Sequence, residues 1–376
     1  MLANKYGKET LLRLRENETF ERRTVSFYRY VRLENVNTLR NDLYQVWTEL
    51  GILGRTYLAT EGINAQMTVP VPNWDAFVAD LDSRVVFAKM PLKIALEEKG
   101  SAFLKLIVRV KPRILADGLD DNEIDMNRMG EHLTPVQFNE ALAHPDAVVV
   151  DVRNHYEHEI GHFDNAIRPD VDTFQESLPI IRDTLADHKD KPVLMYCTGG
   201  IRCEKASAYL RANGFQDVSQ LNGGIIAYAQ HVKEAKIESK YRGKNFVFDD
   251  RKNEKITDDI LSTCHLCDNP CDEHQNCQNH ACHLLFLQCQ TCAKRLNNCC
   301  SAECKRIAGL PLEEQRTLRR EARQRAGDSH YVSQLNRKKR KANPGAEETK
   351  ENSTTIELKT KEINSGTTEL VSETNS

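Results

Sequence analysis

Cys197 is the residue of this chain whose surroundings are most suited to covalent chemistry. It follows the apolar run 192–196, which is typical of a buried parallel strand, and it precedes two glycines and a predicted helix over 204–211. A cysteine at such a strand-to-helix turn is surrounded by inward-pointing backbone amides, which favour an anion. Arg202 adds a fixed positive charge to the same loop. We therefore predict that Cys197 is a catalytic thiolate whose pKa is lowered by Arg202 and the loop amides.

The loop between these two residues is predicted to surround the reacting group, and it consists of Thr198, Gly199, Gly200 and Ile201. The next residue, Cys203, has two possible roles. It either resolves an oxidised or persulfidated Cys197, or it has a structural role at the start of the helix.

Residues upstream of this loop carry a second, longer pattern. The strand-like run 148–153 ends in Asp-Val-Arg and is followed by Glu157 and by Gly161-His162. Together with the cysteine loop, this pattern resembles the rhodanese domain, whose signature has the form D-V-R-x-x-x-E-x-x-x-G-H-x-x-x-A. The resemblance implies a parallel α/β sheet with Cys197 as its catalytic residue. The loop has the form Cys-x4-Arg, shorter than the Cys-x5-Arg loop of the related phosphatases, so phosphatase chemistry is disfavoured. For three nearby histidines we expect a structural or surface role, in preference to a metal or acid–base cluster: His155, His158 and His162.

The elements around this domain predict a chain of several units. Residues 1–22 form a polar lead-in, and residues 23–115 show the order βαββαβ of a ferredoxin-like sandwich, closed by a strand over 104–110. Residues 116–131 are a linker and residues 132–236 are the rhodanese α/β domain. Within the latter, Thr134 is predicted to cap a helix that begins at Pro135.

Composition restricts the class and compartment of the protein. The chain has 376 residues, 40% hydrophobic and 28% charged, with a formal net charge of −3, as in soluble multidomain proteins. The sequence contains neither an apolar run long enough to cross a membrane nor an apolar N-terminal leader, so a cytoplasmic protein without membrane contact is expected. In that reducing compartment the twelve cysteines indicate metal ligands and reactive thiols.

Residues 237–310 are predicted to form a Cys-rich, metal-binding segment. Two pairs have the Cys-x2-Cys spacing that closes a tetrahedral thiolate site: Cys264 with Cys267, and Cys289 with Cys292. Such a polar segment needs a metal for stability, so structural zinc at two sites is preferred over an iron–sulfur cluster or free thiols. The candidate ligands are all ten cysteines of the segment: Cys264, Cys267, Cys271, Cys277, Cys282, Cys289, Cys292, Cys299, Cys300 and Cys304.

A basic segment, 311–341, follows the cysteines. Residues 305–341 carry twelve Lys or Arg against four Asp or Glu. Arginines at three- and four-residue spacing would share one face of a helix: Arg316, Arg319, Arg320 and Arg323. Beside a zinc module, this pattern favours binding to nucleic acid phosphates. Residues 342–376 are polar and are predicted to be disordered.

The order of these units resembles one bacterial family, the UPF0176-like, rhodanese-type tRNA uridine(34) 5-hydroxylases. The most specific matches are 151–157, 196–207, 243–249 and the Cys-rich pattern. The resemblance implies an enzyme that makes 5-hydroxyuridine at the wobble position of tRNA, with molecular oxygen as co-substrate.

Three interpretations of the function remain open at this level. In the first, Cys197 takes part in the oxidation of C5, for example by adding to C6 of the uracil ring. In the second, the cysteine carries a persulfide and the protein is a sulfurtransferase in tRNA thiolation. In the third, the chain is a non-catalytic RNA-binding scaffold, which the intact cysteine disfavours.

Overall fold

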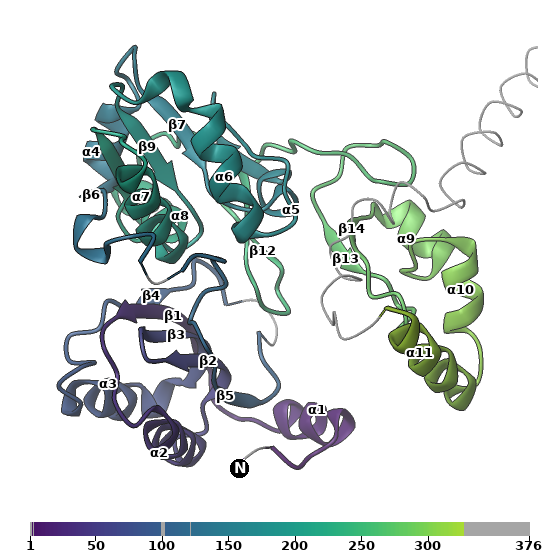
Figure 1. Ribbon diagram of the computed structural model, residues 1–376. Helices are drawn as coiled ribbons and strands as arrows, with labels where there is room; N and C mark the ends of the chain where they lie inside the picture. Colours follow the sequence, from purple (N-terminus) through teal and green to yellow (C-terminus); the bar gives the residue numbers. More distant parts are fainter. Residues whose placement is uncertain (1, 3, 99–101, 121, 327–376) are drawn as a thin grey trace, which may run out of the picture. The chain divides into compact units, whose positions relative to one another are not determined.

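The computed structural model describes residues 2, 4–98, 102–120 and 122–326, and the chain divides into two compact units, Met1–Asp259 and Ile260–Ser376 (Figure 1). The first unit contains an N-terminal sandwich and a central α/β domain, and the second contains the Cys-rich segment. Within the described ranges, no helix is both long and apolar enough to cross a membrane. The basic run 337–341 and the predicted disordered tail 342–376 lie outside the described residues.

The N-terminal sandwich has a five-stranded sheet with helices packed on one face (Figure 1). The strand order is β4-β1-β3-β2-β5. A short helix, α1 (Lys8–Glu16), precedes the sheet. The strands and helices of the sandwich are β1 (Arg22–Tyr30), α2 (Val36–Glu49), β2 (Leu53–Ala59), β3 (Gly62–Pro70), α3 (Trp74–Ser83), β4 (Lys93–Ile94) and β5 (Leu106–Val110).

The two faces of this sheet follow from the alternation along β1. Val25 and Phe27 are fully buried in the core formed with α2 and α3, which includes Trp47. Tyr28 and Tyr30 have the opposite parity, so they lie on the other face of the sheet. That second face packs against the central domain, as described below.

The predicted βαββαβ order is confirmed, with one correction to the closing strand. The strand that pairs antiparallel with β1 is the two-residue β4. The run 104–110 instead provides β5, which pairs in parallel with β2 at the opposite edge of the sheet. A strand of two residues carries no alternating pattern, so periodicity does not reveal β4. Periodicity reveals only β5, whose pattern does not show which strand it pairs with.

The central domain is an α/β structure with an entirely parallel core sheet, as predicted, and it has three layers. The strand order is β6-β10-β9-β7. Helices α6 and α7 pack on one face of the sheet, and α4 and α8 pack on the other. The bounds are β6 (Glu131–Leu133), α4 (Pro135–Ala141), β7 (Val148–Asp151), α5 (His155–His158), β8 (Gly161–Phe163), α6 (Phe174–Thr184), β9 (Val193–Tyr196), α7 (Ile201–Ala212), β10 (Val218–Leu221), α8 (Gly224–Ala235), β11 (Tyr241–Phe246) and β12 (Asn253–Lys255).

Two local predictions in this domain can be compared directly with the structure. Thr134 caps α4 through a capping box with Gln137, and Pro135 is its first residue, which confirms the predicted start. Helix α7 begins at Ile201, three residues before the predicted start. Gly200 has a φ of +99°, a conformation that glycine adopts freely, and this lets the chain turn directly from the loop into the helix.

In its described residues, 260–326, the second unit combines a two-stranded hairpin with three helices (Figure 1). Its apolar core is small and includes Leu284, Phe286 and Leu287, beside several buried cysteines. The elements are β13 (His274–Asn276), β14 (Leu285–Leu287), α9 (Gln290–Leu296), α10 (Ala302–Ala308) and α11 (Leu312–Ala326).

Candidate functional site

Cys197 lies directly after β9, in the loop that leads into α7, and its side chain is fully buried. The backbone N–H of Gly200 donates a hydrogen bond to its Sγ over 3.1 Å. The backbone N–H groups of Arg202 and Cys203 also donate to this sulfur. The first turn of α7 and the loop therefore form an anion-binding nest around Cys197.

The electrostatics of this nest favour the thiolate. Burial raises the pKa of Cys197, but hydrogen bonding from the Cys203 thiol, the charge of Arg202 and the backbone amides outweigh it and lower the pKa to about 6. Burial and the neighbouring Cys197 raise the pKa of Cys203 well above its ordinary value. At neutral pH, Cys197 is therefore charged and Cys203 is a protonated donor.

Glu157 holds Arg202 beside the nucleophile. The two side chains form a buried, bidentate ion pair with N–O distances of 2.5 Å and 2.7 Å. The hydroxyl of Thr198 donates to the same carboxylate over 3.4 Å, so Glu157 also fixes the loop. Glu157 was not among the predicted site residues, although it is the glutamate of the rhodanese-like signature, which was the available signal.

The first turn of α8 supports the loop from another side. Its amides at Ile225 and Ile226 donate to the carbonyl oxygens of Cys197 and Thr198 over 3.0 Å and 3.2 Å. Gly224 has a φ of +66°, and a Cβ at this position would lie 2.5 Å from the Cys197 carbonyl oxygen. A side chain at residue 224 would therefore displace the loop.

The N-terminal sandwich covers the same loop. The hydroxyl of Tyr28 donates to Glu204 over 2.8 Å, and a Cβ at Gly200 would lie 2.7 Å from that hydroxyl. Lys205 in α7 forms an ion pair of 2.8 Å with Glu61, in the turn between β2 and β3. The sandwich thus lies over the first turn of α7, and nothing in the spacing of its residues predicts this contact.

The three histidines near the signature have structural partners. His155 and His158 interact with the backbone oxygens of Val171 and Pro169, and His162 interacts with that of Phe163. These contacts agree with the structural role that we expected.

Eight of the ten predicted metal ligands gather into two groups of four. The groups are Cys264, Cys267, Cys289 and Cys292, and Cys277, Cys282, Cys300 and Cys304. The first group unites the two Cys-x2-Cys pairs, which are far apart in sequence. In each group all the sulfur atoms lie within 4.8 Å of one another. The structure brings Cys271 and Cys299 into neither group: both are buried, and the Cys299 thiol donates to the Asn297 carbonyl oxygen.

The geometry of both groups fits a tetrahedral zinc ion. Zn–S bonds of about 2.3 Å in a tetrahedron place the sulfur atoms roughly 3.8 Å apart. The sulfur atoms of Cys267 and Cys289 are 3.6 Å apart, and that of Cys300 is 3.7 Å from those of Cys282 and Cys304. A disulfide would require about 2.0 Å. N–H groups also donate to the sulfurs, as thiolate ligands require, for example from Asn279 to Cys304 over 3.4 Å.

The predicted basic helix is present as α11. Arg316 and Arg320 are exposed and Arg319 is half-buried. Arg316 forms an ion pair with Glu313, and Arg320 donates to Thr317. Arg323 belongs to the same helix, although its side chain is not among those that the structure describes.

Comparison with known proteins identifies relatives for most of the chain. Residues 22–114 match the UPF0176 acylphosphatase like domain, residues 134–231 the rhodanese-like domain, and residues 242–305 the domain described as Rhodanase C-terminal. The tRNA uridine(34) hydroxylase of Leptospira interrogans is 51% identical, over 85% of this chain and 87% of its own length. The protein of the same name from Yersinia pestis is 46% identical, over 90% of this chain and 94% of its own length. A rhodanese-like domain protein of known structure from Staphylococcus aureus is 28% identical, with a TM-score of 0.22, and covers 26% of this chain and 90% of that chain.

Proposed function

Since this chain belongs to the tRNA uridine(34) hydroxylase family, we propose that it converts the wobble uridine of tRNA to 5-hydroxyuridine through Cys197. The observation that carries this assignment is the buried thiolate in its nest of amides, with a pKa of about 6. Action on tRNA also implies a cytoplasmic protein.

The chemistry begins with the nucleophile that the loop provides. A thiolate that adds to C6 of uracil turns the C5–C6 double bond into an enolate, in which C5 is electron-rich and open to oxidation. Arg202 and the amides of the nest stabilise the thiolate before this step, and Glu157 keeps Arg202 in position. Cys203 supplies a hydrogen bond to the sulfur, which makes it a positioning residue in this proposal.

Molecular oxygen is the proposed source of the new hydroxyl group. One oxygen atom enters at C5, and the second is reduced to water with two electrons and two protons, so a cellular two-electron reductant is also consumed. The loop around the reacting ring consists of Thr198, Gly199, Gly200 and Ile201.

Zinc, held by the two groups of four cysteines, has a structural role in the second unit.

Helix α11 is proposed to contact the tRNA backbone through its arginines. Replacing Arg316, Arg319 and Arg320 together by glutamine should weaken tRNA binding by roughly ten- to a hundredfold at moderate salt, because each phosphate contact releases condensed counterions. Binding isotherms at several salt concentrations should also show a shallower salt dependence for the variant. A matched variant with the exposed Lys236, Lys294 and Lys305 replaced by glutamine removes the same number of charges and controls for total charge. Unchanged affinity and slope in the arginine variant would contradict the assignment.

Nucleoside mass spectrometry tests the proposed function as a whole. A tRNA with unmodified uridine at position 34 should gain the mass of one oxygen atom when it is incubated with the purified protein, oxygen and a reductant. Without oxygen its mass should not change. Appearance of a thiolated nucleoside in place of 5-hydroxyuridine would instead identify a sulfurtransferase. No change in the tRNA, with tRNA still bound, would identify a scaffold.

A further inference from the structure

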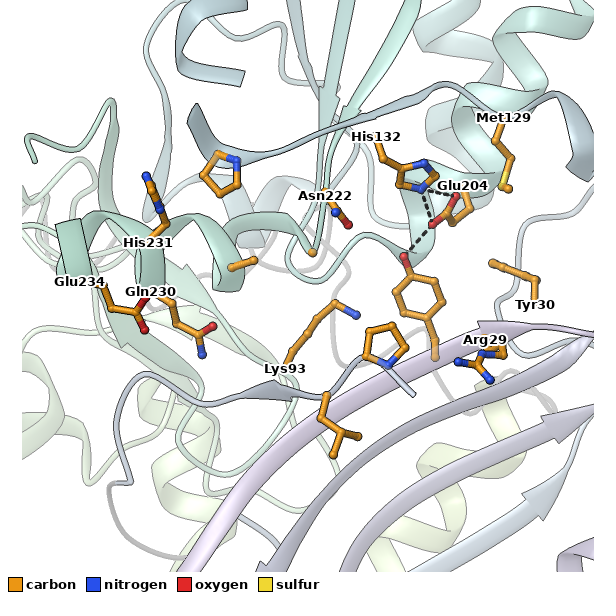
Figure 2. A pocket seen from close by; sticks show the side chains of 16 residues that line it. Arg29, Tyr30, Lys93, Met129, His132, Glu204, Asn222, Gln230, His231 and Glu234 are labelled. Atoms are coloured by element: carbon orange, nitrogen blue, oxygen red, sulfur yellow. Dashed lines mark hydrogen bonds and ion pairs between the residues drawn. The ribbon is translucent and has the colours of Figure 1, made fainter. Parts of the chain in front are cut away.

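A cavity of about 650 Å³ lies between the N-terminal sandwich and the central domain (Figure 2). Both domains contribute to its wall: Tyr28 and Lys93 come from the sandwich, and His132, Glu204 and Asn222 come from the central domain. None of these residues was predicted as a site residue. The cavity lies beside the catalytic loop because Glu204 is in the first turn of α7 and Asn222 precedes the turn that supports Cys197.

Lys93, on the short strand β4, is the charged residue that the sandwich brings to this loop. Its ammonium nitrogen lies 4.3 Å from the centre of the Tyr28 ring, and Figure 2 shows it pointing into the cavity. A Cβ built on Gly199 would lie 3.8 Å from Cδ of Lys93, and one built on Gly223 would lie 3.9 Å from its Cε. The lysine stem therefore crosses both turns that surround Cys197.

The charge of Lys93 is coupled to that of the nucleophile. Burial lowers the pKa of Lys93 to about 8, while Cys197 and Glu204 act in the opposite direction, so the side chain remains an ammonium at neutral pH. Several other ionisable groups interact with the Cys197 thiolate, from α7 and from β1: Arg202, Cys203, Tyr28 and Tyr30. Lys93 is the cation that the sandwich adds to this set.

The cavity wall contains groups that can hydrogen-bond to a planar, polar ring and stack on it. Uracil has two carbonyl oxygens that accept hydrogen bonds and one N–H group that donates, and the cavity offers an ammonium group, the Asn222 carboxamide and the Tyr28 ring. Enzymes that modify a base take it out of the stack into such a pocket. The wall of this cavity combines two tyrosine rings and apolar side chains with several polar and charged ones, and it lies beside the nucleophile, where a substrate site is expected.

We propose that this cavity receives the target uracil ring, and that Lys93 stabilises the negative charge on O4 as Cys197 adds to C6. This inference rests on the proposed function. In the step itself the S–C6 bond forms, and the π electrons of the C5–C6 bond move onto C5 and, by conjugation, onto O4. Protonation of C5 by solvent and reversal of the addition restore the starting uridine, with its C5 hydrogen exchanged.

Lys93 is suited to this role because of its flexible stem. Cys197 is fully buried and is not itself part of the cavity wall, so a base reaches the sulfur only after a covering side chain moves. Lysine is a point charge on four rotatable carbons, and its ammonium can follow O4 as the ring approaches. The charge is thus brought to the oxygen where it develops, which is the arrangement that accelerates such additions.

Three full-length variants distinguish the effect of the positive charge of Lys93 from the effect of the size of its side chain. Lys93→Met removes the ammonium and keeps the length of the stem, and Lys93→Arg keeps the charge. Lys105→Met removes an exposed lysine of the same sandwich that does not line the cavity. Thermal unfolding of each variant serves as the control for folding.

The first measurement is the rate of alkylation of Cys197 by iodoacetamide as a function of pH. Trypsin yields the peptide 190–202, which contains Cys197 without Cys203, so mass spectrometry reads this thiol alone. In the wild type, alkylation should increase as the pH rises through about 6, because the thiolate is the reactive form. Loss of the ammonium in Lys93→Met should move this midpoint to higher pH, because the thiolate loses a nearby positive charge. Lys93→Arg and Lys105→Met should keep the wild-type midpoint.

The second measurement is tritium release from tRNA that contains [5-³H]uridine, in the absence of oxygen. Wild type and Lys105→Met should release tritium at the same rate, Lys93→Met about a hundredfold more slowly, and Lys93→Arg at an intermediate rate. In air, the kcat values for hydroxylation should rank the four proteins in the same order as the rates of tritium release, and the KM for tRNA should change little.

An unchanged rate of release in Lys93→Met would overturn the proposal, whatever its alkylation profile. Absence of hydroxylation by the wild type itself would instead overturn the proposed function, and the alkylation profiles would then still report the contact between Lys93 and Cys197.

Discussion

Replacement of Cys197 by alanine is expected to abolish the formation of 5-hydroxyuridine in tRNA, with a loss of at least about three orders of magnitude in rate. The reason is that the thiolate, with a pKa of about 6, is the nucleophile that the loop, Arg202 and Cys203 are arranged to stabilise. Alanine has no group that can add to the uracil ring. The measurement is nucleoside mass spectrometry of tRNA after incubation with the purified variant.

The controls for this experiment come from the same loop. Alanine removes one buried sulfur, which should cost about 1 kcal/mol of folding free energy, so thermal unfolding should show a folded protein. Cys203→Ser keeps a hydrogen-bond donor beside Cys197 and should retain a substantial part of the activity. Wild-type rates in Cys197→Ala would show that the chemistry resides elsewhere.

Loss of either group of four cysteines is expected to unfold the second unit and leave the first unit intact. A structural zinc ion contributes about 10–16 kcal/mol at neutral pH, more than a small apolar core of a few leucines and a phenylalanine can supply. The wild type should contain two equivalents of zinc by elemental analysis, one for each group. Cys264→Ser and Cys277→Ser should each contain at most one equivalent, because unfolding of the unit also weakens the remaining group. Limited proteolysis should remove residues beyond 259 and spare those before it.

Cys271→Ser is the matched control, since Cys271 is a buried cysteine of the same segment outside both groups. It should keep both equivalents of zinc and resist proteolysis like the wild type. Loss of an equivalent in this variant would contradict the ligand sets assigned here, and a wild type free of zinc would contradict the metal itself.

The fold was predictable where a pattern extends over several residues. The alternation in β1, the capping box at Thr134 and the apolar run of β9 all describe local structure that neighbouring residues determine. The position of β5 was not predictable, because strand order depends on pairing between distant residues. The early start of α7 depends on the left-handed conformation of Gly200, which the residue type permits and does not require.

The site was predictable in part for the same reason. Cys197 and the residues of its loop are contiguous, so their chemistry is visible in the sequence. The two zinc groups required the fold, because the first joins pairs separated by more than twenty residues and the second joins residues of irregular spacing. Lys93 carries no local signal: it is a single lysine in a polar run, and its contact with the loop exists only because the sandwich packs on α7.

The complete burial of Cys197 beneath the sandwich has a consequence for the lifetime of the enzyme. A thiolate that is charged at neutral pH is the form that peroxides oxidise to sulfenic and then to irreversible acids. An enzyme that consumes oxygen, as we propose for this one, works where such by-products arise. Because the sulfur is withheld from solvent until a side chain above it moves, oxidation is slowed in proportion to the time for which the site is closed. The N-terminal sandwich thus protects the catalyst between turnovers.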